Sequence, residues 1–177
     1  MNSSFSEAKQ RYLRLRQAAY DHAQYELQQV LRKEFRVRDW SGKTASAIAD
    51  QWGIARHADA GWDWPEIIRR YKGEANSLPL AIWTKTEERL AAVALGLCTR
   101  RAVELKFLEA DPRSDCPLKG KRVLIALEVA FYYAQALGLQ EIRVRPINSK
   151  LETLYVEVYG FEVAAPFDQM RYLRKRV

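Results

Sequence analysis

The segment from residue 111 to residue 122 contains the side chains best suited to binding a charged ligand. A polar run, Arg113–Gly120, follows an apolar stretch and precedes the strongest helical pattern in the chain. Backbone amides at a helix start bind anions, and a glycine lets an anion approach the backbone closely. Lys119, Lys121 and Arg122 add positive charge beside Gly120. The pattern is equally typical of an anion site and of a surface loop with a glycine turn.

Metal chemistry and nucleophilic catalysis have little support. Cys98 and Cys116 lie 18 positions apart and outside any CxxC motif, and the only histidines are His22 and His57. A zinc site usually needs four ligands at short spacings. We therefore expect no metal, no Ser–His–Asp triad, and two free thiols in a reducing compartment.

The first 76 residues are predicted to be mainly helical. From Ser6 to about Glu34, apolar residues recur every three or four positions, which predicts a long amphipathic helix with Ser6 as its N-cap. A short strand over Phe35–Trp40 follows, because apolar and polar residues alternate there. Two further helices are expected over Thr44–Arg56 and Trp64–Lys72, the second with Pro65 in its first turn.

Strands dominate the rest of the chain. Three extended runs, Leu78–Thr84, Leu90–Thr99 and Ala102–Ala110, predict a β-meander. The expected elements after them are a helix over Lys121–Leu137 that ends at Gly138, a strand over Glu141–Pro146, a helix over Ser149–Tyr159, and a hairpin of Phe161–Ala165 with Met170–Arg174.

This element order predicts an α/β (α+β) fold. A strand–helix–strand unit lies within an otherwise antiparallel set, which gives a mixed, mostly antiparallel central sheet flanked by helices, with an extra long N-terminal helix. The 177 residues suit a single domain, because no linker is long enough to divide them. We expect an N-terminal helix over 1–34, a helical region over 35–76 and a core over 78–177.

The element order and two motifs resemble the GCN5-related N-acetyltransferase (GNAT) superfamily. The first family marker, Q/R-x-x-G-x-G/A, begins three residues after a strand-end proline, here Pro112. Its positions then fall on Asp115, Leu118 and Gly120, and Val123–Leu124 fall where the family usually has a Leu–Leu pair. A shift of two residues instead puts Gly120 at the first glycine and Arg122 at the second.

The second marker, N-x-x-A-x-x-L-Y followed by G-F, is better matched. The matching residues are Asn148, Leu151 in place of alanine, Leu154, Tyr155, and Gly160–Phe161. The stretch between the tyrosine and the glycine is one residue longer than in the commonest form. The resemblance covers residues 78–175, and the first third of the chain matches no family motif.

The resemblance implies an N-acetyltransferase that moves an acetyl group from acetyl-CoA to an amine by direct attack. Residues 78–177 would bind acyl-CoA, and residues 35–76 would face the substrate. Glu104 corresponds to a catalytic base, with Glu109 as second choice on the opposite strand face by alternation. Tyr155 corresponds to the general acid, although Tyr159 is close enough to leave the choice open. The implied cofactor-binding residues are Leu108, Ala110, Leu118, Lys119, Gly120, Lys121, Arg122 and Asn148.

Charge and composition leave other functions open. The chain has 29 Lys and Arg against 22 Asp and Glu, a net charge of +7, and 19 of the 29 are arginine. Arginine suits phosphate and carboxylate partners, so a nucleic-acid-binding protein is one alternative. A non-catalytic GNAT-like binding or regulatory module is another, since Asp115 and Leu118 depart from the first motif. The long first helix either covers the sheet or mediates a homodimer. With no apolar run of about 20 residues, we expect a cytoplasmic protein without a membrane partner.

Overall fold

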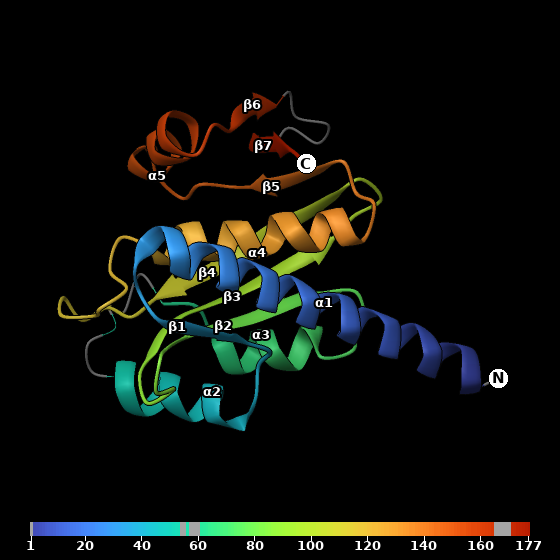
Figure 1. Ribbon diagram of the computed structural model, residues 1–177, viewed down its shortest axis with the longest axis horizontal. Coiled ribbons are helices and arrows are strands. Elements are labelled where there is room, and N and C mark those ends of the chain that lie inside the picture. The colour runs from blue at the N-terminus through green and yellow to red at the C-terminus, as the bar shows by residue number, and fades with distance from the viewer. Residues whose placement is uncertain (1, 54–55, 57–60, 165–170) are drawn as a thin grey trace.

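A mixed sheet forms the centre of the computed structural model, which describes residues 2–53, 56, 61–164 and 171–177 (Figure 1). Among these residues the sheet has seven strands in the order β1-β2-β3-β4-β5-β7-β6. Only the β4–β5 pair is parallel, and the other pairs are antiparallel. The fold class predicted from the sequence is therefore confirmed. The strands are β1 (Phe35–Arg38), β2 (Leu78–Thr84), β3 (Leu90–Cys98), β4 (Ala102–Ala110), β5 (Glu141–Val144), β6 (Glu162–Ala164) and β7 (Tyr172–Arg176).

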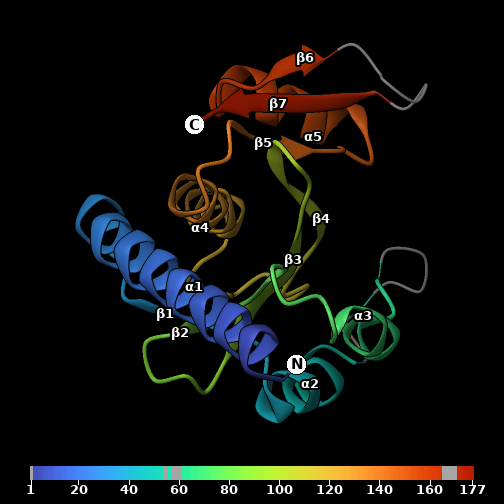
Figure 2. The ribbon, with the colours of Figure 1, turned by 90° about the vertical axis from the view of Figure 1, so that its right-hand side faces the viewer.

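Helices cover the two faces of the sheet unequally (Figure 2). The long α1 (Asn2–Leu31) and α4 (Arg122–Ala136) lie on one face. The opposite face carries α2 (Gly42–Ala47), the π-helix η1 (Ile48–Trp52) and α3 (Trp64–Tyr71). The remaining helical segments, α5 (Ser149–Thr153) and the π-helix η2 (Leu154–Val158), connect β5 to β6.

Two apolar cores follow from this arrangement. The larger lies between the sheet and the α1–α4 layer and includes Leu105, Leu118, Ile125 and Tyr155. The smaller lies under α2, η1 and α3 and is rich in tryptophan, with Trp52 and Trp64 both 0% exposed. Tryptophan buries more apolar area than other side chains, so a few of these residues suffice to fix the short helices against the sheet.

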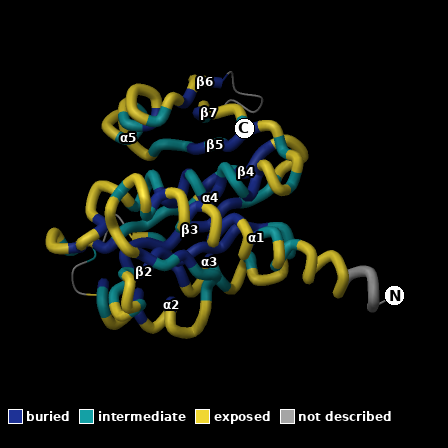
Figure 3. Tube along the Cα trace, in the orientation of Figure 1, coloured by how far each residue is buried: buried dark blue, intermediate teal, exposed yellow. Residues whose placement is uncertain are grey.

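Polar side chains of α1 fasten it to the rest of the molecule. Arg16 Nη1 donates to the carbonyl oxygens of Ser77 at 3.0 Å and Ala75 at 3.2 Å, and its Nη2 lies 3.2 Å from Asp39 Oδ2. The hydroxyl of Tyr20 donates to the carbonyl oxygen of Pro79. Beyond these anchors, residues 6–11 are exposed and α1 extends past the sheet (Figure 3).

Several helix boundaries differ from the sequence-based prediction. Ser6 is not the N-cap, because α1 begins at Asn2; other polar residues precede Ser6, and a serine alone does not fix a helix start. The same helix ends at Leu31, since Arg32 has a φ of +49°. The next helix begins at Gly42, capped by Ser41, and continues as a π-helix to Trp52.

Other predicted boundaries hold. Pro65 lies in the first turn of α3, and Gly138 follows α4 with a φ of +70°. The closing hairpin is confirmed as antiparallel pairing of β6 with β7, whereas the predicted ends at Ala165 and Met170 lie outside the described residues.

Candidate functional site

A β-bulge in β4 separates this strand from β5. Leu95 of β3 pairs with Phe107, whereas the next residue, Gly96, pairs with Leu105, so Lys106 is an extra residue on β4. A bulge bends its strand and ends regular pairing. Accordingly β4 pairs with β5 only as far as Leu105, and its last five residues have no pairing with β5.

A cleft of about 210 Å³ occupies the gap that opens there. Leu108 and Ala110 of β4 and Tyr155 of η2 line it on the α4 side of the sheet. On the other side it is lined by Lys106, Arg145 and Trp62. Because residues of both sheet faces border the cleft, two reactants could enter it from opposite faces.

The backbone of β4 faces this cleft with unused hydrogen-bonding groups. The Asp111 amide donates to the Ala91 carbonyl oxygen at 2.9 Å, and Ala110 is paired with Ala92. In an antiparallel pair, alternate residues direct their N–H and C=O groups to opposite sides. Ala110 and Leu108 therefore direct theirs away from β3 and toward the cleft, where an extended ligand could add as a strand.

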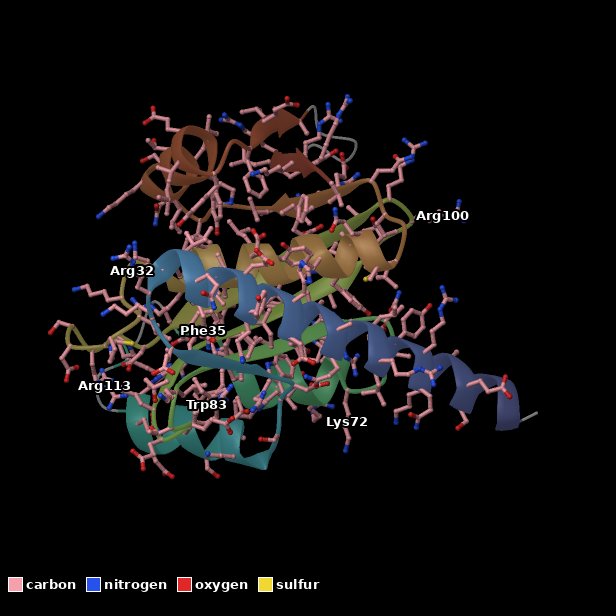
Figure 4. The ribbon with its side chains drawn as sticks, in the orientation of Figure 1. Arg32, Phe35, Lys72, Trp83, Arg100 and Arg113 are labelled. Carbon is pink, nitrogen blue, oxygen red and sulfur yellow. The ribbon has the colours of Figure 1, made fainter. Side chains whose placement is uncertain are left out.

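The loop after β4 brings a cationic helix start to one end of the cleft. Lys119, Gly120 and Lys121 are exposed, and Gly120 has a φ of +79°. The amides of Arg122, Val123 and Leu124 open α4, and such amides have no partner within their helix. Val123 also lines the cleft. Figure 4 shows the loop, marked by Arg113, at the opposite end of the sheet from Arg100, which precedes β4. The loop can thus hold an anion at the cleft's edge.

Two predicted loop residues have structural contacts. The side chain of Leu118 is in the larger core with the residue 1% exposed, so only its backbone remains for a ligand. Arg122 Nη1 donates to the Asp111 carbonyl oxygen at 2.7 Å, which ties the end of β4 to the start of α4.

Arg89 neutralises the acidic residues of this loop. Its guanidinium donates to Asp111 Oδ2 at 2.8 Å and Asp115 Oδ1 at 2.7 Å, and Arg113 also pairs with Asp111 at 2.8 Å. Burial alone would raise the pKa of Asp111, but hydrogen bonds from Arg113 and Arg89 outweigh it and lower that pKa. The hydrogen bond from Arg89 also lowers the pKa of Asp115. The negative charge of Asp115, at the first position of the ungapped motif, is therefore compensated.

The lowered pKa of Asp111 predicts an acid-sensitive loop. Ionised Asp111 stabilises the fold fully above its ordinary pKa of 3.8, and this stabilisation is lost as the pH falls through the lower pKa of the folded state. We expect Asp111→Asn to reduce the free energy of unfolding by about 2 kcal/mol at pH 7 and by less at pH 3. Denaturant titrations at the two pH values measure this. Asp115→Asn is the control, since that side chain is 76% exposed; an equal loss in both variants would contradict the prediction.

Tyr155 lines the cleft on the α4 side of the sheet, next to the larger core. It is 5% exposed, and its ring packs 5.5 Å from that of Phe161. Burial, with a smaller contribution from Tyr159, raises the pKa of Tyr155 to about 12. The π-helical turn Leu154–Val158 takes up the extra residue seen in the motif, since π-helices accommodate single insertions. Gly160, with a φ of +69°, and Phe161 then follow as the motif requires.

Glu104 lies beside the cleft, in an ion pair. Its Oε1 accepts from Arg145 Nε at 3.0 Å, and Arg145 lines the cleft. Val103 and Leu105 face the larger core, so Glu104 faces the opposite side of the sheet. A carboxylate on this side can receive a proton from a reactant that enters the cleft there.

The predicted face of Glu109 is wrong. Simple alternation puts it opposite Glu104, but the bulge at Lys106 shifts the alternation by one, so both carboxylates lie on the α2–α3 face. Arg56 donates to the two carboxylate oxygens of Glu109 at 2.7 and 2.8 Å. The Trp62 amide at 3.1 Å and Trp64 Nε1 at 2.7 Å also donate to it. With four donors, Glu109 is suited to holding Trp62 at the cleft and poorly suited to accepting a proton.

The remaining predicted residue lies outside the cleft lining. Asn148 is the N-cap of α5, and its Oδ1 accepts from the Leu151 amide at 2.9 Å. Sequence reasoning missed Lys106, Arg145 and Trp62 as cleft residues, because the bulge and the contact of Trp62 with Glu109 bring them to the gap. No periodic pattern marks such a bulge.

Among the residues that the structure describes, the thiols and acidic groups show no metal-binding arrangement. Within the described ranges no three His, Cys, Asp or Glu residues cluster as metal ligands. Cys116 is buried in the larger core, and burial raises the pKa of the Cys98 thiol to about 12. In the part of the chain that the structure describes, no helix has the length and apolarity needed to cross a bilayer.

Comparison with solved structures identifies the architecture. The fold matches the PaiA N-acetyltransferase of Thermoplasma acidophilum, solved in complex with coenzyme A, with a TM-score of 0.50, 16% identity, and coverage of 81% of this chain and 99% of that one. It also matches a GNAT-family acetyltransferase of Listeria monocytogenes, with a TM-score of 0.53, 15% identity and coverage of 81% and 95%. The chain has the GNAT fold. The ribosomal-protein-S5-alanine acetyltransferase of Vibrio fischeri is a third GNAT-fold match, with a TM-score of 0.55, 16% identity and coverage of 81% and 92%.

The likeness to GNAT structures is one of fold rather than sequence. No family model matches the sequence, and no curated protein matches it. The resemblance read from the two short motifs is therefore supported by the three-dimensional structure, which matches GNAT-fold acetyltransferase structures over 81% of this chain.

Proposed function

We propose that this protein is an acetyl-CoA-dependent N-acetyltransferase. The observation that carries the proposal is the cleft between β4 and β5, into which Leu108 and Ala110 direct unpaired backbone groups beside the cationic start of α4. The GNAT fold supports it, as does the structure of the Thermoplasma neighbour in complex with coenzyme A.

The residues present fit the two parts of a CoA molecule. The backbone N–H and C=O groups of Leu108 and Ala110 would pair with the amides of the pantetheine arm as a strand does. The amides that open α4, with Lys119 and Lys121, would hold the pyrophosphate. Bound acetyl-CoA supplies an activated acetyl thioester. The acceptor amine would enter from the opposite face, beside Glu104 and Arg145.

The chain must move one proton for this reaction. Transfer of the acetyl group to an amine forms a C–N bond, breaks the C–S bond and takes a proton from nitrogen to sulfur. Glu104 is the proposed base, directly or through water, and Tyr155 is the proposed donor to the sulfur. A tyrosine with a pKa near 12 stays protonated at neutral pH, so it is suited to stabilising a leaving thiolate with a hydrogen bond.

Calorimetric titration with acetyl-CoA and with CoA tests the proposal. We expect one site with a dissociation constant on the order of micromolar, about −8 kcal/mol. Lys119→Gln combined with Lys121→Gln should weaken binding roughly 10- to 100-fold, because each exposed charge contact contributes about 1 kcal/mol and 1.4 kcal/mol corresponds to a factor of ten. Lys33→Gln combined with Lys72→Gln removes the same charge from exposed positions elsewhere and should change little. No heat with either ligand would overturn the proposal and favour a non-catalytic binding module.

A further inference from the structure

A second hollow, lined by arginines, lies on the sheet face that α2 and α3 leave uncovered. It has a volume of about 730 Å³ and lies over β5 and β7. Four of its lining residues are Arg101, Arg143, Arg174 and Arg176, against one acidic residue, Glu141. A hollow of this size matches the range of small-molecule sites.

The register of β5 and β7 concentrates this charge. Arg143 lies directly opposite Arg174, and Glu141 lies opposite Arg176. Like charges directly opposite each other destabilise a sheet. Glu141 compensates mainly Arg143, which donates to it at 2.6 Å. The described lining residues include no second acidic side chain to neutralise Arg101, Arg174 and Arg176.

The arginines also have unused donors. Within the described part of the chain, the side chains of Arg101 and Arg176 have no hydrogen bond or ion pair, and both residues are exposed. Arg174 Nε is buried without a hydrogen-bond partner there, and its guanidinium lies 3.9 Å from the nearest oxygens of Glu141 and Glu162. Guanidinium groups bind phosphate oxygens in pairs. A phosphate group in the hollow would accept from the exposed guanidinium groups of Arg101 and Arg176 and relieve the repulsion.

One aromatic ring lies between the hollow and the cleft. Tyr172 lines the hollow, and its ring centre lies 4.7 Å from the Arg143 guanidinium and 5.8 Å from that of Arg145. Arg145 in turn lines the cleft and pairs with Glu104. A ligand anchored in the hollow can therefore extend past Tyr172 to the place where the acceptor amine would react.

We propose that the arginine hollow binds the phosphate of the acceptor, so that the substrate is a phosphorylated small-molecule amine. The identification of the bound molecule as the acceptor rests on the proposed function. Phosphate binding in the hollow does not depend on that function. The hollow's volume of about 730 Å³ lies within the range of small-molecule sites, which favours a small molecule over a longer polymer.

Calorimetry with inorganic tripolyphosphate tests the site without any acetyl donor. The starting protein for this test, called the parent, carries Lys119→Gln and Lys121→Gln. These changes lower the anion affinity of the cationic loop before α4, which would otherwise compete for tripolyphosphate. Adding Arg101→Gln and Arg176→Gln should lower tripolyphosphate affinity at least tenfold at an ionic strength of about 0.15 M. The matched control adds Lys33→Gln and Lys72→Gln to the same parent, for an equal loss of charge. No binding to the parent, or an equal loss in the control, would overturn the proposal.

Two further outcomes separate the alternatives. If a 20-nucleotide single-stranded RNA binds the parent more tightly than tripolyphosphate, and Arg101→Gln/Arg176→Gln abolishes this binding, the small-molecule assignment is wrong and a nucleic acid occupies the face. If wild-type protein binds no CoA but the parent binds tripolyphosphate, the acetyltransferase proposal fails while the phosphate site remains.

Discussion

Replacing Tyr155 with phenylalanine is expected to lower kcat for acetyl transfer about 100-fold and to leave CoA affinity within about twofold. The hydroxyl is the only part removed, and the ring that packs on Phe161 remains. Because burial raises the pKa of Tyr155 to about 12, the wild-type hydroxyl is protonated throughout the range from pH 6 to pH 10. The ratio of wild-type to variant kcat should therefore stay constant across that range.

Tyr159→Phe is the matched control for this variant. Tyr159 is the other tyrosine that the motif left open, and it does not line the cleft. Its kcat should stay within about threefold of wild type. If the two variants lose activity equally, or if Tyr155→Phe loses none, Tyr155 is not the proton donor.

The second large effect is on stability. Glu109→Ala is expected to reduce the free energy of unfolding by about 3–5 kcal/mol, because it leaves a half-buried guanidinium and two N–H groups without their acceptor. The Glu109 side chain is 11% exposed and that of Arg56 is 22% exposed, so water replaces the lost contacts poorly. Denaturant titration at neutral pH measures the change.

A double-mutant cycle separates the ion pair from the packing around it. Arg56→Ala/Glu109→Ala should lose less stability than the sum of the two single variants, since the first change already removes the main partner. Glu104→Ala, which removes the ion pair with Arg145, is the comparison and should lose less than Glu109→Ala. Additive losses, or a loss below about 1 kcal/mol for Glu109→Ala, would contradict the assigned structural role.

Most of the fold could be predicted from the sequence because its elements have clear periodic patterns. The three strands of the meander and the helix Arg122–Ala136 are strongly apolar, and Gly138 ends that helix as expected. The helix boundaries were less predictable. Several polar residues near the start of α1 could serve as its N-cap, so a local pattern does not fix where the helix begins. The π-turns at Ile48 and Leu154 depend on tertiary packing, which a local pattern does not contain.

The candidate site was predictable only in part. The family resemblance pointed to Leu108, Ala110 and Tyr155, and these residues do meet at one cleft. It did not reveal that Leu118 packs into the core or that Asn148 serves as a helix cap. The compensation of Asp115 by Arg89 joins residues 26 positions apart, so no local motif could indicate it.

The extra residue at Lys106 has a consequence for how this architecture tolerates sequence change. The opening between β4 and β5 depends on one additional residue in β4. Any residue whose side chain can point out of a bulge can occupy this position. The opening is thus encoded by a residue count rather than by particular amino acids. Substitution of the surrounding side chains can then leave the opening in place, provided that the extra residue is kept.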